Sequence, residues 1–229
     1  MEQLVIYFPL LLKGLGVTVS MAVLAMGLAC LMGALGAWGQ MSRWRAVRWL
    51  VMGYTTVVRG IPDLVMILIF YYKMQALANW LTGLAGIERF SISPYAAGTI
   101  TIGLIYGAYL TETFRGATLA VDRGQGEAAT ALGLRPFQTL RLVTLPQIIR
   151  QALPGTMNVW MVLTKSTAVV SIIGLSDLVG VAVDAGRSQR QFFWFLLAAF
   201  AGYLLITWVS QMIFDRLERR YERGFAETR

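Results

Sequence analysis

Several charged side chains lie inside segments of the sequence that are otherwise apolar. Asp63, Glu112 and Lys165 are each flanked by residues typical of a membrane-spanning helix. A charge at membrane depth costs roughly 3 kcal/mol or more, so each one needs a partner of opposite charge or a water-filled cavity. These residues are therefore either internally compensated or part of the wall of a path through the membrane.

The spacing of neighbouring charges leaves both interpretations open. Arg59 precedes Asp63 by four residues and Glu112 precedes Arg115 by three, so each pair could meet on one helix face. Alternatively, Asp63 and Glu112 line the path and provide negative potential for a cationic amino acid. Lys165 could pair with Glu112 or meet the carboxylate of a substrate.

Two tyrosines, Tyr106 and Tyr109, lie in the same segment as Glu112. Aromatic residues of membrane helices are commonly interfacial or packed, so these rings need not face a substrate. We include Tyr109 in the candidate translocation path, with Asp63, Glu112 and Lys165, and leave the role of Tyr106 open.

The composition places these residues in an integral membrane protein. Of the 229 residues 57% are hydrophobic and 14% are charged, and the mean hydropathy is +0.61. The absence of histidine and the single cysteine, Cys30, exclude imidazole chemistry, disulfides and cysteine metal sites. No G-x-x-x-x-G-K-[ST] phosphate loop occurs, so we expect no ATP hydrolysis on this chain.

Five apolar segments are long enough, or nearly so, to cross a bilayer as helices. They are 15–38, 53–72, 95–116, 156–183 and 192–214. The fourth is interrupted at 165–167 and again at Gly174 and Asp177, which predicts a discontinuous span followed by a short helix. We predict an all-α, polytopic membrane protein with five transmembrane helices, forming a single unit over residues 1–229.

Glycines are spaced for close helix packing in two of these segments. Gly33 and Gly36 lie in the first segment, and Gly103 and Gly107 in the third. Small residues at such spacing usually let two membrane helices approach each other, so we assign these positions to packing.

The basic residues between the segments predict the orientation, because lysine and arginine in short loops stay in the cytoplasm. Twelve lie in the first loop, the third loop and the tail: Arg43, Arg45, Arg48, Arg123, Arg135, Arg141, Arg150, Arg216, Arg219, Arg220, Arg223 and Arg229. Five lie on the opposite side: Lys13, Lys73, Arg89, Arg187 and Arg190. The N-terminus is therefore predicted outside and the C-terminus inside. The net charge of +8 then reflects topology, and we expect no nucleic-acid partner.

The cytoplasmic segment after the third span has a different composition, with small residues, charges and prolines. Residues 127–132 predict a short helix with the acidic Glu127 in its first turn. Gly133 could end that helix in a left-handed cap, and Pro136 could begin a second piece that ends at Pro146. A surface helix would also explain this composition, but small side chains beside a rigid bend favour a docking element.

The string Glu127-Ala128-Ala129, followed by Gly133 and then Leu145-Pro146, resembles the EAA loop of permease subunits of bacterial ATP-binding-cassette importers. The resemblance covers nearly the whole chain. The further strings typical of the polar-amino-acid branch are Arg59-Gly60-Ile61-Pro62, Tyr109 with Glu112, Arg115 and Gly116, and Pro154, Asn158 and Lys165-Ser166-Thr167. The stretch beginning at Arg59 is most similar to the Q-type subunit of the histidine and octopine permeases.

The resemblance implies the function, the partners and the residues that contact them. The cytoplasmic loop, about 121–154, would dock into a separate ATPase through Glu127, Ala128, Ala129, Gly133, Leu134 and Pro146. The implied partners are two ATPase subunits that hold ATP and magnesium, a second permease subunit, and a periplasmic solute-binding protein; a heterodimer is favoured over a homodimer. This chain would hold no cofactor and would be no enzyme. It would import histidine, arginine, lysine, ornithine or an opine by alternating access, as a multi-pass protein in the lipid of a bacterial inner membrane.

Two other classes of protein were weighed against this interpretation. A secondary transporter or channel would predict internal repeats and leaves the docking loop unexplained. A membrane scaffold that recruits a cytosolic partner explains the loop but leaves Asp63, Glu112 and Lys165 unexplained.

Overall fold

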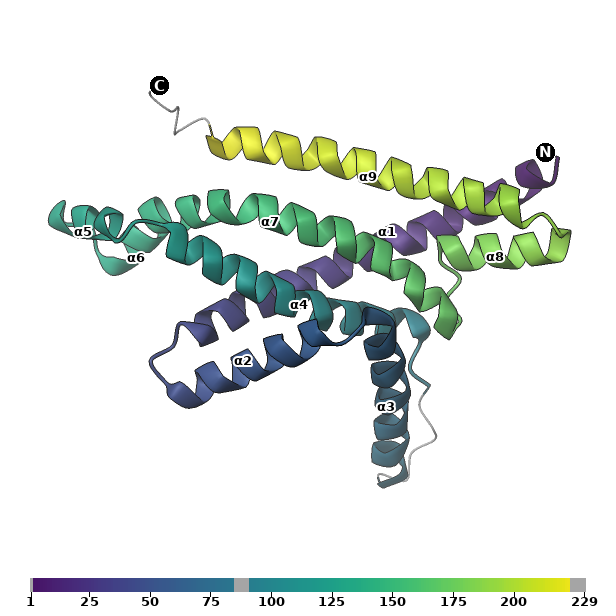
Figure 1. Cartoon of the computed structure of the whole chain (residues 1–229), viewed down its shortest axis with the longest axis horizontal. Helices are drawn as coiled ribbons and strands as arrows, with labels where there is room; N and C mark the ends of the chain where they lie inside the picture. Colours follow the sequence, from purple (N-terminus) through teal and green to yellow (C-terminus); the bar gives the residue numbers. More distant parts are fainter. Residues whose placement is uncertain (1, 85–90, 223–229) are drawn as a thin grey trace.

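The computed structural model describes residues 2–84 and 91–222, and this part of the chain is helical throughout, with no strand (Figure 1). Its elements in order are α1 (Glu2–Gln40), α2 (Arg45–Gly60), α3 (Asp63–Leu84), α4 (Pro94–Ala120), α5 (Arg123–Ala131), α6 (Pro136–Thr139), a π-helical segment η1 (Leu140–Thr144), α7 (Leu145–Ser166), a 3₁₀ segment η2 (Thr167–Ile173), α8 (Leu178–Gln189) and α9 (Phe192–Glu222). The predicted all-α class is confirmed for these residues. Arg89, Arg223 and Arg229, which contributed to the predicted orientation, lie outside the described residues.

The long helices α1 and α4 pack against each other at the centre of the molecule, and glycines form their contact. A Cβ added at Gly36 would overlap Thr111 Oγ1 and lie 2.8 Å from its Cγ2, and one at Gly33 would lie 2.6 Å from a leucine of α4. A Cβ at Gly103 or Gly107 of α4 would lie 2.6 or 2.7 Å from a side chain of α1. The predicted packing role of these glycines is therefore confirmed: on both helices they let the backbones approach.

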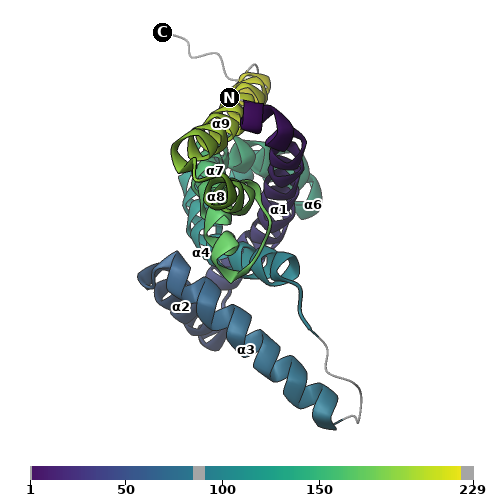
Figure 2. The ribbon, with the colours of Figure 1, turned by 90° about the vertical axis from the view of Figure 1, so that its right-hand side faces the viewer.

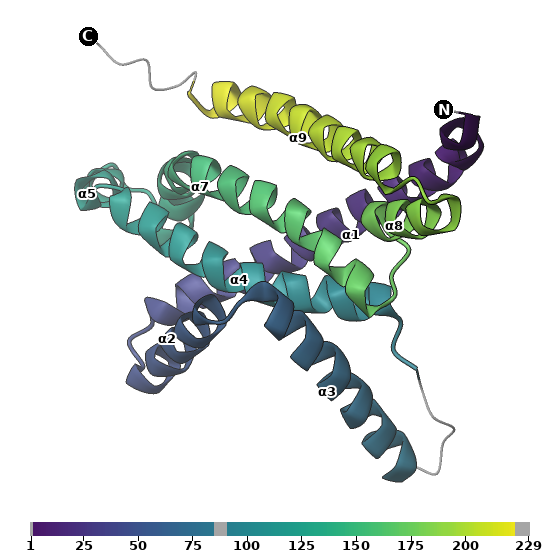
Figure 3. The same ribbon diagram turned by 45° about the vertical axis from the view of Figure 1, so that its right-hand side comes forward.

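The segment 53–72, predicted as one span, is divided into two helices, so that prediction was wrong. α2 ends at Gly60 and α3 begins at Asp63, with Ile61 extended at φ −111° and ψ 137°. Pro62 explains the break, because it lacks an N–H group and disfavours helical geometry at the residue before it. α3 then leaves the bundle at a steep angle and contacts only α4 and η2 closely (Figures 2 and 3).

The fourth predicted segment is discontinuous, as predicted. α7 ends at Ser166, η2 follows, and Gly174 turns the chain with φ 91°, a conformation that glycine adopts without a Cβ penalty. Asp177 then caps α8, because its Oδ1 accepts a hydrogen bond from the Gly180 amide at 2.9 Å. A second, smaller core holds α8 against α1 and α9.

Asp177 lies in the turn between η2 and α8 and is fully buried. Its Oδ2 has no hydrogen-bond partner among the described residues. Burial raises the pKa of this carboxyl to about 6, although backbone amide donors act in the opposite direction. The folded state therefore favours the protonated carboxyl. Asp177 contributes fully to the free energy of unfolding below its unfolded pKa of 3.8, and this contribution is lost as the pH rises through about 6.

Four helical stretches among the described residues are long and apolar enough to cross a membrane: Leu4–Gln40, Asp63–Leu84, Pro136–Ile173 and Phe192–Tyr221. This agrees with a polytopic membrane protein. The third stretch runs through Pro146, so the prediction that a short helix ends there was wrong. Pro146 occupies the first turn of α7, where a missing N–H costs little, and the π-helical η1 joins α6 to α7.

The elements that carry polar loops gather at the two ends of the molecule. The α1–α2 turn, α5, α6 and the C-terminal end of α9 lie towards one end, and the N-terminal part of α1 and α8 lie towards the other (Figure 1).

Candidate functional site

Asp63 lies where three helices meet. As the first residue of α3, it accepts two hydrogen bonds on Oδ2, from Tyr106 Oη of α4 at 2.6 Å and from Ser166 Oγ of α7 at 2.9 Å. Tyr106 and Ser166 are buried, whereas Asp63 is half-buried. Its Oδ1 has no hydrogen-bond partner in the described part of the chain. Two hydrogen bonds to Oδ2 thus hold the carboxylate in place, and Oδ1 remains available to accept a further hydrogen bond.

Arg59 does not form the predicted pair with Asp63. The break at Pro62 places the two residues on different helices, and no salt bridge joins them. The guanidinium of Arg59 lies over the ring of Tyr109 instead, 5.4 Å from its centroid, a cation–π arrangement. Tyr109 in turn stacks on Tyr106, with ring centroids 5.6 Å apart. The two tyrosines therefore connect the carboxylate of Asp63 to the cation of Arg59 along one face of α4.

Glu112 forms the predicted pair with Arg115, whose NH2 and Nε lie 2.9 and 3.1 Å from Glu112 Oε2. Gln40, the last residue of α1, donates to the other oxygen of Glu112 at 2.7 Å. The charge of Glu112 is therefore compensated within the chain. Its hydrogen bond to Gln40 also ties the end of α1 to α4.

Lys165 lies in the last turn of α7 and is exposed. It makes no salt bridge with a described residue, and Glu112, its suggested partner, pairs with Arg115 instead. The buried Ser166 beside it, and not Lys165, reaches Asp63. The structure thus brings Asp63 and Tyr109 into one polar group, while Glu112 and Lys165 lie outside its hydrogen bonds.

Three residues that hydrogen-bond to the candidate carboxylates were not identified as site residues from the sequence: Tyr106 and Ser166 at Asp63, and Gln40 at Glu112. The sequence pattern assigns no role to Tyr106 and marks Ser166 only as part of a break in a span. Gln40 is a polar residue at the end of a long apolar run, which was the only local signal for it.

The docking element predicted from the sequence corresponds to α5 and the turn that follows it. α5 begins at Arg123, capped by Asp122, so Glu127 lies in the middle of the helix and not in its first turn as predicted. Gly133 has φ 81°, as predicted for a left-handed cap. The Gly133 amide bonds to the Thr130 carbonyl at 2.9 Å and the Leu134 amide to the Ala129 carbonyl at 3.1 Å, the pattern of a Schellman motif.

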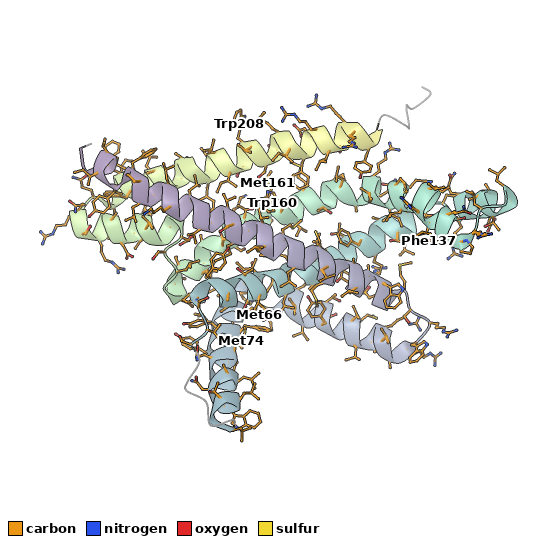
Figure 4. All side chains as sticks on the ribbon, turned by 180° about the vertical axis from the view of Figure 1, so that it is seen from behind. Met66, Met74, Phe137, Trp160, Met161 and Trp208 are labelled. Carbon is orange, nitrogen blue, oxygen red and sulfur yellow. The ribbon has the colours of Figure 1, made fainter. Side chains whose placement is uncertain are left out.

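The tip of this element exposes apolar side chains. Leu132 is 83% exposed, and Phe137 of the adjoining α6 is 70% exposed and lies towards the same end of the molecule as α5 (Figure 4). Glu127 and Ala128 are exposed as well, whereas Ala129 is buried against the chain itself. Exposed apolar groups next to small side chains on a rigid turn form a surface suited to docking.

Comparison with known proteins identifies similar sequences along nearly the whole chain. The family model described as binding-protein-dependent transport system inner membrane component matches residues 8–224. The histidine/lysine/arginine/ornithine transport system permease protein HisQ of Escherichia coli is 44% identical over 214 residues, covering 93% of this chain and 94% of that protein. The octopine transport system permease protein OccQ of Rhizobium meliloti is 40% identical over 215 residues, covering 93% and 91%.

A solved structure is similar as well. The crystal structure of an amino acid ABC transporter with histidines contains a chain that is 31% identical to this one. The two align with a TM-score of 0.79, covering 95% of this chain and 96% of the other.

Proposed function

This chain belongs to the family of binding-protein-dependent transport system inner membrane components, and from that premise we propose that it carries basic amino acids across a bacterial inner membrane. It is a permease of the amino-acid ABC transporter type; a secondary transporter, a channel and a passive scaffold are not favoured. The observation that carries the proposal is the near full-length similarity to a permease for histidine, lysine, arginine and ornithine.

The proposed selectivity for cations depends mainly on Asp63. Its Oδ1 has no partner among the described residues, so it remains available to an ammonium or guanidinium group. Glu112 would add negative potential further along α4, and the exposed Lys165 would meet the substrate carboxylate.

The proposed topology has five spans, with the N-terminus outside and the C-terminus inside. It adds the central helix α4, which is 27 residues long, to the four apolar stretches. What supports the orientation is the grouping of the α1–α2 turn, α5, α6 and the end of α9 at one end of the molecule. These elements hold five of the twelve arginines expected in the cytoplasm: Arg43, Arg123, Arg216, Arg219 and Arg220.

The energy would come from two ATPase subunits, which would hold ATP and magnesium and dock on α5. The proposed contact residues are Glu127, Ala128, Ala129, Gly133, Leu134 and Pro146. A second permease subunit, different from this one, and an external solute-binding protein would complete the transporter. What supports the docking role is the exposed tip of α5 and its rigid glycine cap.

Reconstituted transport tests this function. The chain is co-purified with its neighbouring subunits, placed in proteoliposomes, and supplied with ATP and labelled arginine, histidine or a neutral amino acid. We expect ATP-dependent uptake that favours arginine and histidine. Uptake that proceeds with an ion gradient and without ATP would refute the proposal, and so would a preference for the neutral substrate.

A further inference from the structure

A polar pocket of about 530 Å³ opens where the end of α1, the middle of α2 and the C-terminal part of α4 meet. Its wall includes Arg48, Trp49, Met52, Thr56, Glu112 and Arg115. The volume lies in the range of ordinary small-molecule sites. None of the proposed transport steps uses this pocket except through Glu112.

The charges in the pocket favour an anion. Glu112 is already compensated by Arg115 at 2.9 Å and by the amide of Gln40 at 2.7 Å. Arg48 is exposed and has no salt bridge with any described residue. The pocket therefore keeps a net positive charge and presents guanidinium and hydroxyl donors that match a phosphate.

The surroundings of the pocket favour a lipid over a solute. Trp49 in its wall is 71% exposed, and Trp38 and Trp44, close in sequence at the end of α1 and the start of α2, are 77% and 64% exposed, with Arg43 and Arg45 between these tryptophans in the sequence. Tryptophan and arginine gather at the boundary between a membrane and water, and basic pockets between helices on the cytoplasmic side bind anionic head groups. Helix stability does not explain Arg45 and Arg48, because cations in the first turn of α2 oppose the helix dipole.

We propose that this pocket binds the head-group phosphate of an anionic phospholipid from the cytoplasmic leaflet. Arg48 is its main ligand, Thr56 donates a further hydrogen bond, and the apolar surfaces of Trp49 and Met52 contact the glycerol and acyl carbons. The choice of leaflet rests on the proposed orientation of the chain.

Retention of phosphatidylglycerol by the purified complex tests the inference. The chain with its partner subunits is extracted, exchanged into phosphatidylcholine containing a fraction of phosphatidylglycerol, and examined by native mass spectrometry. Arg48→Gln should lower retention about tenfold, the effect of one charge-assisted hydrogen bond, and Arg48→Lys should restore part of it. Arg45→Gln removes the same charge from the same helix outside the pocket wall and should lower retention less than about twofold.

Equal losses in the Arg48→Gln and Arg45→Gln variants would mean only diffuse attraction to the surface and would overturn the inference. It would equally be overturned if inorganic phosphate displaced phosphatidylglycerol, since the site would then take a soluble anion. Because retention is measured without transport, an inactive complex that still retains the lipid would refute the proposed function alone. An active complex without selective retention would refute the lipid site alone.

Discussion

Replacing Gly36 by alanine should push α1 away from α4. The added methyl group would overlap Thr111 Oγ1 and lie 2.8 Å from its Cγ2, whereas two carbons attract best at about 3.5–4.0 Å, so the helices must separate by about 1 Å. Thr111 has little freedom to move aside, because it is fully buried and its hydroxyl donates to the Gly107 carbonyl at 2.8 Å. Overpacking costs about 1–3 kcal/mol, and alanine regains about 1 kcal/mol of helix propensity. We expect a net loss of about 1–2 kcal/mol in the free energy of unfolding.

Thermal unfolding of the purified chain in detergent, followed by tryptophan fluorescence, measures this loss. For a chain of this size the Tm should fall by about 2–8 °C. Gly27→Ala is the matched control, because Gly27 lies on the same helix and a Cβ there meets nothing within 4 Å. That variant should unfold at the same temperature or slightly higher. Equal Tm values for the two variants would refute the packing of α1 on α4 through Gly36.

Three further predictions concern charge, coupling and pH. Asp63→Asn should lower ATP-driven uptake of arginine about tenfold more than uptake of a neutral amino acid, because it removes the carboxylate charge available to a cation; equal losses would make Asp63 structural. Glu127→Lys and Gly133→Asp should leave the chain inserted in the membrane but abolish uptake and co-purification of the ATPase. Gly126→Ala, in an uncrowded position of α5, should retain both. Full uptake in the first two variants would disprove the docking role. Asp177→Asn should raise the free energy of unfolding near neutral pH by about 1–2 kcal/mol, and the decline of this free energy between about pH 4 and 6 should become flatter. Measuring the Tm as a function of pH tests both effects. An unchanged pH profile would contradict the raised pKa of Asp177.

The features that the sequence predicted correctly depend on short-range signals. Gly133 has the positive φ predicted for a left-handed cap, and the predicted interruptions of the fourth segment are a change of helix type after Ser166 and a turn at Gly174. Apolar length alone identified helices but not their breaks. The bend at Pro62 was missed because the apolar pattern continues through it, although the proline itself was visible.

The polar group around Asp63 could be predicted only in part. Its hydrogen bonds join residues 43 and 103 positions apart in the sequence. Helical periodicity says which residues share a face, but it does not say which helix lies opposite that face. The sequence therefore identified Asp63 and Tyr109 as candidates, whereas Tyr106 and Ser166 required the packing of α4 and α7 to be known.

The same packing offers a physical route from the docking element to Asp63. α4 leads into α5 through the Asp122 cap, and the helix that begins at Pro136 continues into α7. Tyr106 lies about 21 Å from the inner end of α4, and Ser166 lies about 31 Å from the start of α7, and both donate to the same oxygen of Asp63. A displacement of α5 by a docked ATPase would act on both helices at once, because each is stiff over these lengths. If α4 and α7 moved unequally, one of the two hydrogen bonds to Asp63 would break, and its carboxylate would become more available to a cation. Docking of an ATPase on α5 would then change the affinity for the substrate without contacting the substrate.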